Sequence, residues 1–388
     1  MDALIAEYAT GVDRRRERIE RRPHPRRRPL EVTMVVSELT VEILIAGFAG
    51  GMVGAAIGAL PALSLSGIAI VVGEMTGTLG DIEGTAIAGV FGVDPATVDV
   101  LGLGGAIGFG PVLGPHVAFA GGVAATAFLG RRETFDTTFR YHQAKNITKP
   151  LGSEPATLLV GGAFGVFGVL VARLAVSAEV PVDPIFFAVV LSAFVHRLAL
   201  GYPLVGRVRG MSRSMLDMTP HVRDERWGEE PYETEQGTEG RLVVEVWLPD
   251  HYEPANVAVL GLAVGLASGY IALVSDSAFL AFGISLFSLA FLALGQYRFP
   301  VTHHMALPAG IAALAVASEF DPTVGLIAAG VFGVLGSLLG EGAQRLFYAH
   351  GDTHVDPPAV SIVVTTLLLG LLATAGVIDP ELIPYPTL

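Results

Sequence analysis

The sequence predicts an all-α polytopic membrane protein of about 8–10 transmembrane helices in two repeated halves, with Gly/Pro-broken or re-entrant segments. Hydrophobic residues make up 52% of the 388 residues and charged residues only 16%, whereas a soluble domain carries about a quarter charged residues. Several apolar runs approach the roughly 20 residues that cross a bilayer as a helix. We therefore expect a multi-pass protein of the cell membrane, with the lipid bilayer as its immediate partner.

One short pattern, H-x-A-[FL]-x-[AG]-G-[VI]-A-A, occurs twice and indicates the repeat. The first copy begins at His116 and the second at His304, and each follows a Pro-Val pair, Pro111-Val112 and Pro300-Val301. Small residues after an imidazole are typical of a helix that packs closely against its neighbours in a membrane. The two copies therefore predict an internal duplication.

Changes in composition divide the chain into five parts. We expect a basic cytoplasmic tail (1–38), a first membrane repeat (39–205), a hydrophilic cytoplasmic lobe (206–255), a second membrane repeat (256–378) and an acidic tail (379–388). The lobe is too short for a catalytic domain of ordinary size. Its segment 241–248 alternates partly between apolar and polar residues, which favours a strand.

In the first half, a Gly/Ala-rich helix is expected from Leu39 to about Leu60, and Pro61 is expected to begin a second. The stretch from Val100 to Pro115 contains so many glycines that it predicts a broken or re-entrant segment. The first His stretch follows it. Two further helices are expected at about 156–177 and 185–203.

In the second half, apolar runs predict five helices, at about 256–274, 277–296, 303–318, 322–347 and 358–378. An acidic residue followed by proline opens a run in each half. Glu154-Pro155 corresponds in order to Asp321-Pro322, and Asp183-Pro184 to Asp356-Pro357. This order supports the duplication.

The relative orientation of the halves stays open. Five crossings per half would make the halves inverted with respect to each other, as in many secondary transporters. A re-entrant His stretch would leave four crossings and parallel halves. Arginines in 130–154 and 206–226 favour the cytoplasm for both loops, and thus the parallel arrangement.

The distribution of charged residues predicts the side of the membrane on which the N-terminus lies, the partners of the chain and its salt environment. The arginine tract from Arg14 to Arg28 predicts a cytoplasmic N-terminus that touches anionic headgroups, although a solvated tail would look the same. A net charge of −13 argues against nucleic acid as a partner. Acidic loops and a lysine count of two, Lys145 and Lys149, are typical of a halophile.

Ionisable side chains within apolar runs are costly and are therefore candidates for function. His116 and His304 begin their stretches, where a neutral imidazole offers one donor and one acceptor. They either flank an ion or substrate site or fix a turn. Arg173 and the pair His196-Arg197 are expected to snorkel or to pair. The candidate ion- or substrate-binding residues are Glu341, His116, His304, Ser337, His303 and Glu74.

Glu341 is the sharpest of these candidates because it lies late in an apolar run. A carboxylate near a hydroxyl and freed carbonyl oxygens suits Na⁺ or a proton. The alternative is a pair with Arg345 at i, i+4 spacing within one helix. Glu74 lies near a helix end, where an interfacial role competes with ion binding.

The sequence lacks the usual signals of an enzyme. It contains no cysteine, which excludes disulfides and thiolate chemistry. Gly102–Gly108 does not have the spacing of a dinucleotide loop, and no metal-ligand motif is visible. His303 and His304 are adjacent and would point about 100° apart on a helix. We expect no catalytic residues, no bound metal and no cofactor other than Na⁺.

Two segments resemble a known family. They are His116 through Leu129-Gly130-Arg131, and Gly333-x-x-Gly336-Ser337-x-x-Gly340-Glu341 with Gly342-Ala343-x-Arg345. They resemble the integral-membrane subunits, especially the E subunit, of the sodium-translocating methyl-tetrahydromethanopterin:coenzyme M methyltransferase of methanogenic archaea. The resemblance implies that Glu341 takes the role of that family's sodium-binding carboxylate. Glu replaces the family's Asp, about three residues after it are missing, and the two segments lie in different halves.

These observations lead to two hypotheses. The first is a cation-coupled (Na⁺ or H⁺) membrane transporter, or a cation-translocating membrane subunit, with a site between the two repeats. The second is a non-transporting membrane scaffold that recruits a soluble partner through the arginine tail and the lobe. Either protein would be compatible with a homo- or hetero-oligomer.

Overall fold

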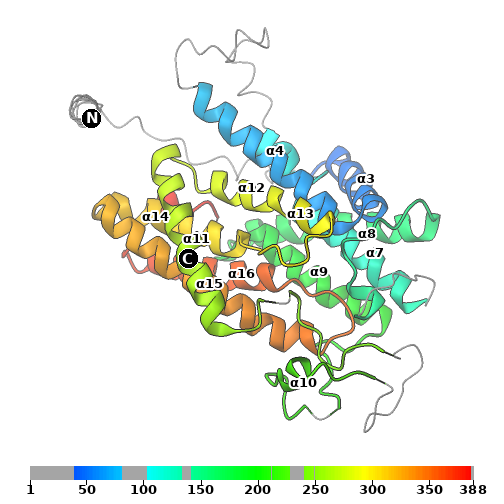
Figure 1. Ribbon diagram of the computed structural model, residues 1–388. Coiled ribbons are helices and arrows are strands. Elements are labelled where there is room, and N and C mark those ends of the chain that lie inside the picture. Colours follow the sequence, from blue (N-terminus) through cyan, green and yellow to red (C-terminus); the bar gives the residue numbers. More distant parts are fainter. Residues whose placement is uncertain are drawn as a thin grey trace. The chain divides into compact units, whose positions relative to one another are not determined.

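The computed structural model describes residues 39–80, 103–132, 141–210, 212–227, 240–248 and 250–385. The predicted basic tail (1–38) lies outside these residues. The α-helices are α3 (Val41–Ile57), α4 (Ala59–Gly80), α7 (Ala120–Arg131), α8 (Pro155–Ser177), α9 (Pro184–Leu200), α10 (Thr219–Val222), α11 (Pro254–Ser275), α12 (Phe279–Ser288), α13 (Ala290–Ala293), α14 (His303–Glu319), α15 (Pro322–Ala343) and α16 (Pro357–Thr374) (Figure 1). Three π-helical turns, η1 (Leu103–Gly108), η2 (Pro115–Phe119) and η4 (Gln344–Ala349), and two short 3₁₀ helices, η3 (Gln143–Lys145) and η5 (Pro380–Leu382), complete the regular structure.

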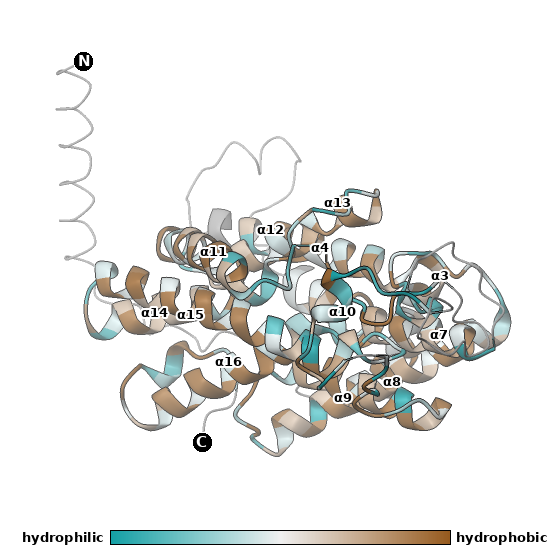
Figure 2. Cartoon of the chain, turned by 60° about the horizontal axis from the view of Figure 1, so that its bottom comes forward, coloured by the Kyte–Doolittle hydropathy of each residue, from teal (hydrophilic) through white to brown (hydrophobic). Residues whose placement is uncertain are grey.

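The described part of the chain is helical, as predicted, and four of its helices are long and apolar enough to cross a membrane. They are Pro155–Ser177, Pro254–Ser275, Pro322–Ala349 and Pro357–Thr374. Shorter apolar helices accompany them at Val41–Ile57, Ala59–Met75, Pro184–Leu200 and Phe279–Ala293. The helices are mostly coloured as hydrophobic in Figure 2.

The acidic residue before each helix-opening proline caps that helix. Glu154 accepts a hydrogen bond from the amide of Thr157 at 2.8 Å, before α8. Asp183, Asp321 and Asp356 accept amide hydrogen bonds at the starts of α9, α15 and α16. Such caps satisfy amides that have no partner within the helix. The Asp/Glu-Pro pairs therefore mark four helix starts correctly.

Three sequence expectations need correction. The second helix begins at Ala59 rather than at Pro61, because Gly58, at φ +95°, provides the break between α3 and α4. The run 277–296 is interrupted, and α12 and α13 replace a single helix. Segment 241–248 forms no ladder, since Leu242 makes only an isolated bridge with Arg226. The amide of Glu245 instead donates to the carbonyl of Ala349 at 3.1 Å.

The chain is interrupted before the first His stretch, as its glycines predicted. The described part runs from η1 through non-helical residues 109–114 into η2, which opens at Pro115. The amide of Gly114 donates to the carbonyl of Gly110 at 2.9 Å and so closes the turn. The second His stretch differs, because α14 contains Pro308 without a break.

Glycine allows helix backbones to touch at two places. A Cβ on Gly51 of α3 would meet the backbone of Gly161 and Gly165 on α8, at 2.9 Å from the Gly165 Cα. A Cβ on Gly265 of α11 would meet the Gly333 Cα on α15 at 3.0 Å. Small residues at such crossings let helices pack by direct van der Waals contact.

Each His stretch also approaches a glycine of the next helix in the chain. A Cβ on Gly168 of α8 would overlap the carbonyl oxygen of His116. A Cβ on Gly336 of α15 would overlap that of His304. The backbone at the start of each His stretch is therefore fixed against a neighbouring helix.

The lobe lies beside one end of each long helix. It directly precedes α11, and Arg345, after the end of α15, donates to the carbonyl of Leu216 at 3.1 Å. Arg209 binds Asp352, just before α16, at 3.0 Å. The amide of His142, in the loop before α8, donates to Glu245 at 2.9 Å. These contacts define a lobe side of the bundle.

The C-terminal acidic segment packs onto α16. The Tyr385 hydroxyl donates to the carbonyl of Thr366 at 2.9 Å, and Tyr385 is buried. Asp379 caps η5 by accepting from the amide of Glu381 at 2.9 Å. The described part of 379–388 is therefore a packed turn.

We predict that Gly168→Ala lowers the melting temperature of the purified protein in detergent, by destabilisation of about 1–3 kcal/mol, because the added methyl group overlaps the His116 carbonyl. Gly342→Ala is the matched control, since a Cβ on Gly342 would meet nothing within 4 Å. It should be neutral or stabilising by up to about 1 kcal/mol. Equal melting temperatures for the two variants would contradict this close contact.

Candidate functional site

Glu341 forms the intrahelical pair that the sequence left as its alternative role. Its Oε1 accepts from Nε of Arg345 at 2.5 Å, and its Oε2 accepts from the Gln344 amide. Arg345 also donates to the carbonyl of Tyr252 at 2.9 Å. Both carboxylate oxygens therefore already have partners, and these partners connect α15 to the lobe side.

Ser337 and Glu74 lie in different surroundings. The Ser337 hydroxyl donates to the carbonyl of Val334 one turn earlier, at 2.8 Å. Glu74 accepts from the hydroxyl of Ser277, which follows the end of α11. Tyr252, next to Arg345, precedes the start of α11, and a helix of 22 residues is about 33 Å long. Glu74 and Glu341 therefore do not share a site.

His303 and His304 belong to an aromatic cluster that includes two residues from the lobe. Trp247 stacks on His251 with ring centroids 5.6 Å apart, and lies 5.9 Å from the ring of His304. The rings of His303 and His304 are 5.9 Å apart. The His304 ring also lies against Gly340 of α15. The structure thus brings His304 next to the turn that carries Glu341.

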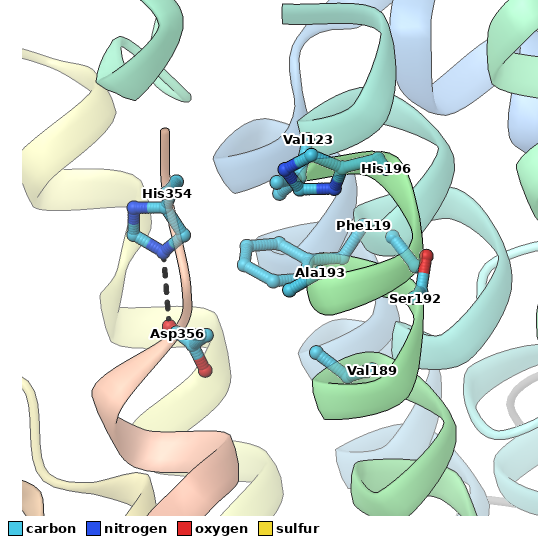
Figure 3. Close-up of a pocket in the computed structure, with 9 residues that line it drawn as sticks. Phe119, Val123, Val189, Ser192, Ala193, His196, His354 and Asp356 are labelled. Atoms are coloured by element: carbon cyan, nitrogen blue, oxygen red, sulfur yellow. Dashed lines mark hydrogen bonds and ion pairs between the residues drawn. The ribbon is translucent and has the colours of Figure 1, made fainter. Parts of the chain in front are cut away.

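A small enclosed cavity lies where α7, α9 and the segment before α16 meet (Figure 3). Its volume is about 10 Å³, close to the space of one water molecule. Its lining residues are Phe119, Ala120, Val123, Val189, Ser192, Ala193, His196, His354 and Asp356. The cavity is therefore apolar on the α7 side and carries polar groups from α9 and from the segment before α16.

The polar groups of this cavity are only partly satisfied. His354 Nε2 lies 3.2 Å from Asp356 Oδ1, and Asp356 Oδ2 accepts from the amide of Ala359 at 3.0 Å. His196 Nε2 lies 3.2 Å from the hydroxyl of Thr353. Among the described residues, the Ser192 hydroxyl and Nδ1 of His354 have no hydrogen-bond partner. Buried polar atoms of this kind offer sites for an ion, a proton or water.

Arg197, next to His196, is fully buried, contrary to the expectation that it snorkels or pairs. It donates to the hydroxyl of Thr353, and to the carbonyls of Leu204 and Phe347, each at 2.7 Å. Among the described residues, the hydrogen-bond acceptors of Arg197 are neutral hydroxyl and carbonyl oxygens. Its position at the end of α9 is favourable because a cation there faces the negative end of the helix dipole. Arg197 thereby holds the 350–356 segment in place.

A chain of buried charges joins the lobe to the helices. Lys145 binds Glu245 at 2.5 Å, and both side chains are fully buried. Arg241 binds the same carboxylate and also Asp352, the latter at 3.1 Å. Arg209 also forms an ion pair with Asp352, at 3.0 Å. We call these five residues the charge network.

Mutual attraction offsets the cost of burying the charge network. Burial alone would raise the pKa of Glu245, but Arg241 and Lys145 hold that pKa below its ordinary value. Burial lowers the pKa of Lys145 to about 8, although Glu245 opposes this shift. Burial would also raise the pKa of Asp352, but Arg241 and Arg209 keep it low. The carboxylates therefore stay ionised at neutral pH.

Sequence reasoning missed the charge network and, of the polar residues around the cavity, singled out only His196. One signal was available, because Lys145 is one of only two lysines in a chain that otherwise uses arginine. Another was the polar stretch Asp352-Thr353-His354-Val355-Asp356 between two apolar runs. In the ranges that the structure describes, no three His, Asp or Glu side chains are grouped to hold a metal.

Comparison with known proteins gives a family without an assigned function. The model of a family of unknown function (DUF7973) matches residues 33–386, so the chain belongs to this family. No curated protein and no solved structure matches the chain. Functional inference therefore rests on the geometry described above.

We predict that Lys145→Met destabilises the protein by about 3–5 kcal/mol, because it leaves a buried carboxylate short of a partner. Lys149→Met is the control, since Lys149 is exposed. Thermal melting in detergent and protease cleavage of the lobe would both report the effect. If Lys145→Met melts at the wild-type temperature, the network does not hold the lobe.

Proposed function

We propose that this member of the family is a cation-coupled membrane transporter, with Na⁺ or H⁺ as the cation and two inverted halves around the site. The observation that carries the proposal is the small cavity between α7, α9 and the start of α16, where Asp356, His354 and His196 lie beside apolar side chains. Its carboxylate, Asp356, and its imidazoles are buried, and Asp356 caps α16, one of the four helices long enough to span a membrane. Ionisable groups in such positions are costly and mark ion pathways.

Matching contacts support the duplication. The pair Gly51–Gly165 between α3 and α8 corresponds to Gly265–Gly333 between α11 and α15. The contact of Gly168 with the His116 carbonyl likewise corresponds to that of Gly336 with the His304 carbonyl. The capped Asp/Glu-Pro helix starts follow in the same order. We therefore pair α3, α7, α8 and α9 with α11, α14, α15 and α16.

Helix directions support inverted rather than parallel halves. The α3 helix runs toward the lobe side, because Leu151, in the loop before α8, donates its amide to the carbonyl of Ala55 at 3.3 Å. Its counterpart α11 starts at the lobe and runs away from it. The α8 helix starts on the lobe side, whereas its counterpart α15 ends there. Inverted repeats with interrupted helices are a common architecture of secondary transporters.

The chemistry of the cavity favours a small cation. Asp356 supplies a carboxylate oxygen, and Ser192 a hydroxyl whose partner is not among the described residues. Hard cations such as Na⁺ prefer oxygen ligands, and a carboxylate beside an imidazole exchanges protons readily. The resemblance to the methyltransferase subunit implies Glu341 for this role. Glu341 is already paired with the arginine cation of Arg345, whereas the partners of Asp356 are the imidazole of His354 and a backbone amide, so we assign the cation to Asp356 instead.

One observation favours the alternative, a non-transporting scaffold. The lobe has an open groove of about 510 Å³ beside Arg345, and Leu216 and Val222 in its lining are exposed. Exposed apolar residues around a groove are typical of a docking surface. A soluble partner that co-purifies with the chain, without cation flux, would support this second function.

We predict that the reconstituted protein carries Na⁺ or H⁺ into proteoliposomes and that Asp356→Asn removes most of this flux. Asparagine keeps the cap on α16 but not the charge. Uptake of radioactive sodium and the fluorescence of an enclosed pH dye would measure the two cations separately.

Asp183→Asn is the matched control, because Asp183 is equally buried and caps α9 in the same way. This variant should keep wild-type flux. Wild-type protein that moves neither cation, or equal losses in the two variants, would contradict the proposed site.

A further inference from the structure

We infer that the transported cation is a proton and that it moves along a row of buried side chains from the lobe to the cavity. In order, the row is His251, His304, His303, Asp356, His354 and His196. We call these residues the imidazole row. This inference rests on the proposed function and adds the identity and the route of the cation.

The first member of the row, His251, belongs to the lobe. His251 lies just before α11 and is covered by the stacked ring of Trp247, which also contacts His304. His251 and His304 therefore both contact the ring of Trp247. Burial lowers the pKa of His251 to about 4, although Asp250 opposes this shift. At neutral pH, His251 is therefore a neutral ring that can both accept and donate a proton.

The middle of the row connects two helices. The rings of His304 and His303 are 5.9 Å apart on α14. The α14 helix, which carries both rings, packs against α16, which Asp356 caps. Asp356 in turn contacts His354 at 3.2 Å. The two adjacent histidines, which are poorly placed to share a metal, thus lie on a helix that contacts both Trp247 of the lobe and α16.

The row ends at the cavity. His354 and His196 both line it, and the two interact electrostatically (Figure 3). His196 contacts the Thr353 hydroxyl, to which Arg197 also donates. The Tyr348 ring lies 5.3 Å from the ring of His354. Among the described residues, Arg197, Tyr348 and Asp356 are thus ionisable groups that lie at this end.

The row is buried and holds unused hydrogen-bonding atoms. Each of its six members exposes 9% of its surface or less. Among the described residues, Nε2 of His251, Nδ1 of His304 and both ring nitrogens of His303 have no partner. Leaving such buried atoms without a hydrogen bond destabilises the fold. Water molecules between the rings would satisfy them and would also link one ring to the next.

Proton transfer along the row leaves its net charge unchanged but leaves each imidazole in its other tautomer, so each ring has to reorient before it carries the next proton. Each imidazole accepts a proton on one nitrogen and releases a proton from the other, and Asp356 accepts and then releases one on its carboxylate. The row contains five imidazoles and one carboxylate. Imidazole nitrogen is a poor ligand for Na⁺, which prefers oxygen. The composition of the row therefore selects a proton over a sodium ion.

His303→Leu is the decisive variant. Because His303 makes no hydrogen bond to the described residues, leucine removes the proton carrier without removing a known bond. We expect the melting temperature to stay the same or to rise, while proton uptake falls by about tenfold or more. If His303 had a purely structural role, the substitution would instead lower the melting temperature. His304→Leu provides a second test of the same step.

His350→Leu is the matched control, since His350 is also buried but lies outside the row. The full-length protein is reconstituted in proteoliposomes, and a potassium diffusion potential drives proton entry onto an enclosed pH dye. Sodium uptake is measured in parallel. The control should keep proton flux within about twofold of wild type.

The outcomes separate the two proposals. Wild-type sodium uptake without proton uptake would overturn the imidazole row and leave the transporter function standing. Proton uptake that persists in both His303→Leu and His304→Leu would also overturn the row alone. Absence of flux for both cations would overturn the row together with the proposed function. Loss of proton uptake in folded row variants, with flux retained in His350→Leu, is the expected result.

Discussion

The helices of this protein depend on contacts between backbones, which only glycine permits. Gly51 against Gly165 and Gly265 against Gly333 bring two helix pairs into direct contact. Gly168 and Gly336 then leave room for the carbonyls of His116 and His304. Between lipid-facing helices the hydrophobic effect contributes little, so close van der Waals packing has to supply the attraction. The glycine contacts therefore determine where each His stretch begins and what its side chains face.

The packed helices bury two groups of polar side chains, the charge network and the imidazole row. In the charge network, Lys145 and Arg241 have carboxylate partners, and this pairing keeps the lobe fixed to the ends of the long helices. In the imidazole row, several ring nitrogens have no partner among the described residues. Satisfied networks stabilise a structure, whereas incompletely satisfied groups are typical of sites that bind or transfer something. This difference is why we assign structure to the first group and ion movement to the second.

The helical class, the helix starts at Asp/Glu-Pro pairs and the break before His116 followed from local patterns. These features depend on composition, capping and glycine, all of which act over a few residues. The fully buried Arg197, the partners of Lys145 and the group around His354 depend on segments 100 or more residues apart. No short pattern encodes such contacts. The sequence did single out Glu341 and His303, but only the fold shows that Arg345 already pairs with the first and that the second makes no bond to the described residues.

The central claim is that the halves are inverted across a membrane, and single-cysteine labelling tests it most directly. The chain has no cysteine, so each introduced thiol is the only one. Ala178 and Ser318 lie at the helix ends away from the lobe, and Ser214 lies in the lobe. All three residues are exposed. A membrane-impermeant maleimide applied to sealed vesicles of one orientation should label either Ser214→Cys alone or both Ala178→Cys and Ser318→Cys. Labelling of Ser318→Cys together with Ser214→Cys from the same side, with Ala178→Cys unlabelled, would contradict the inverted arrangement.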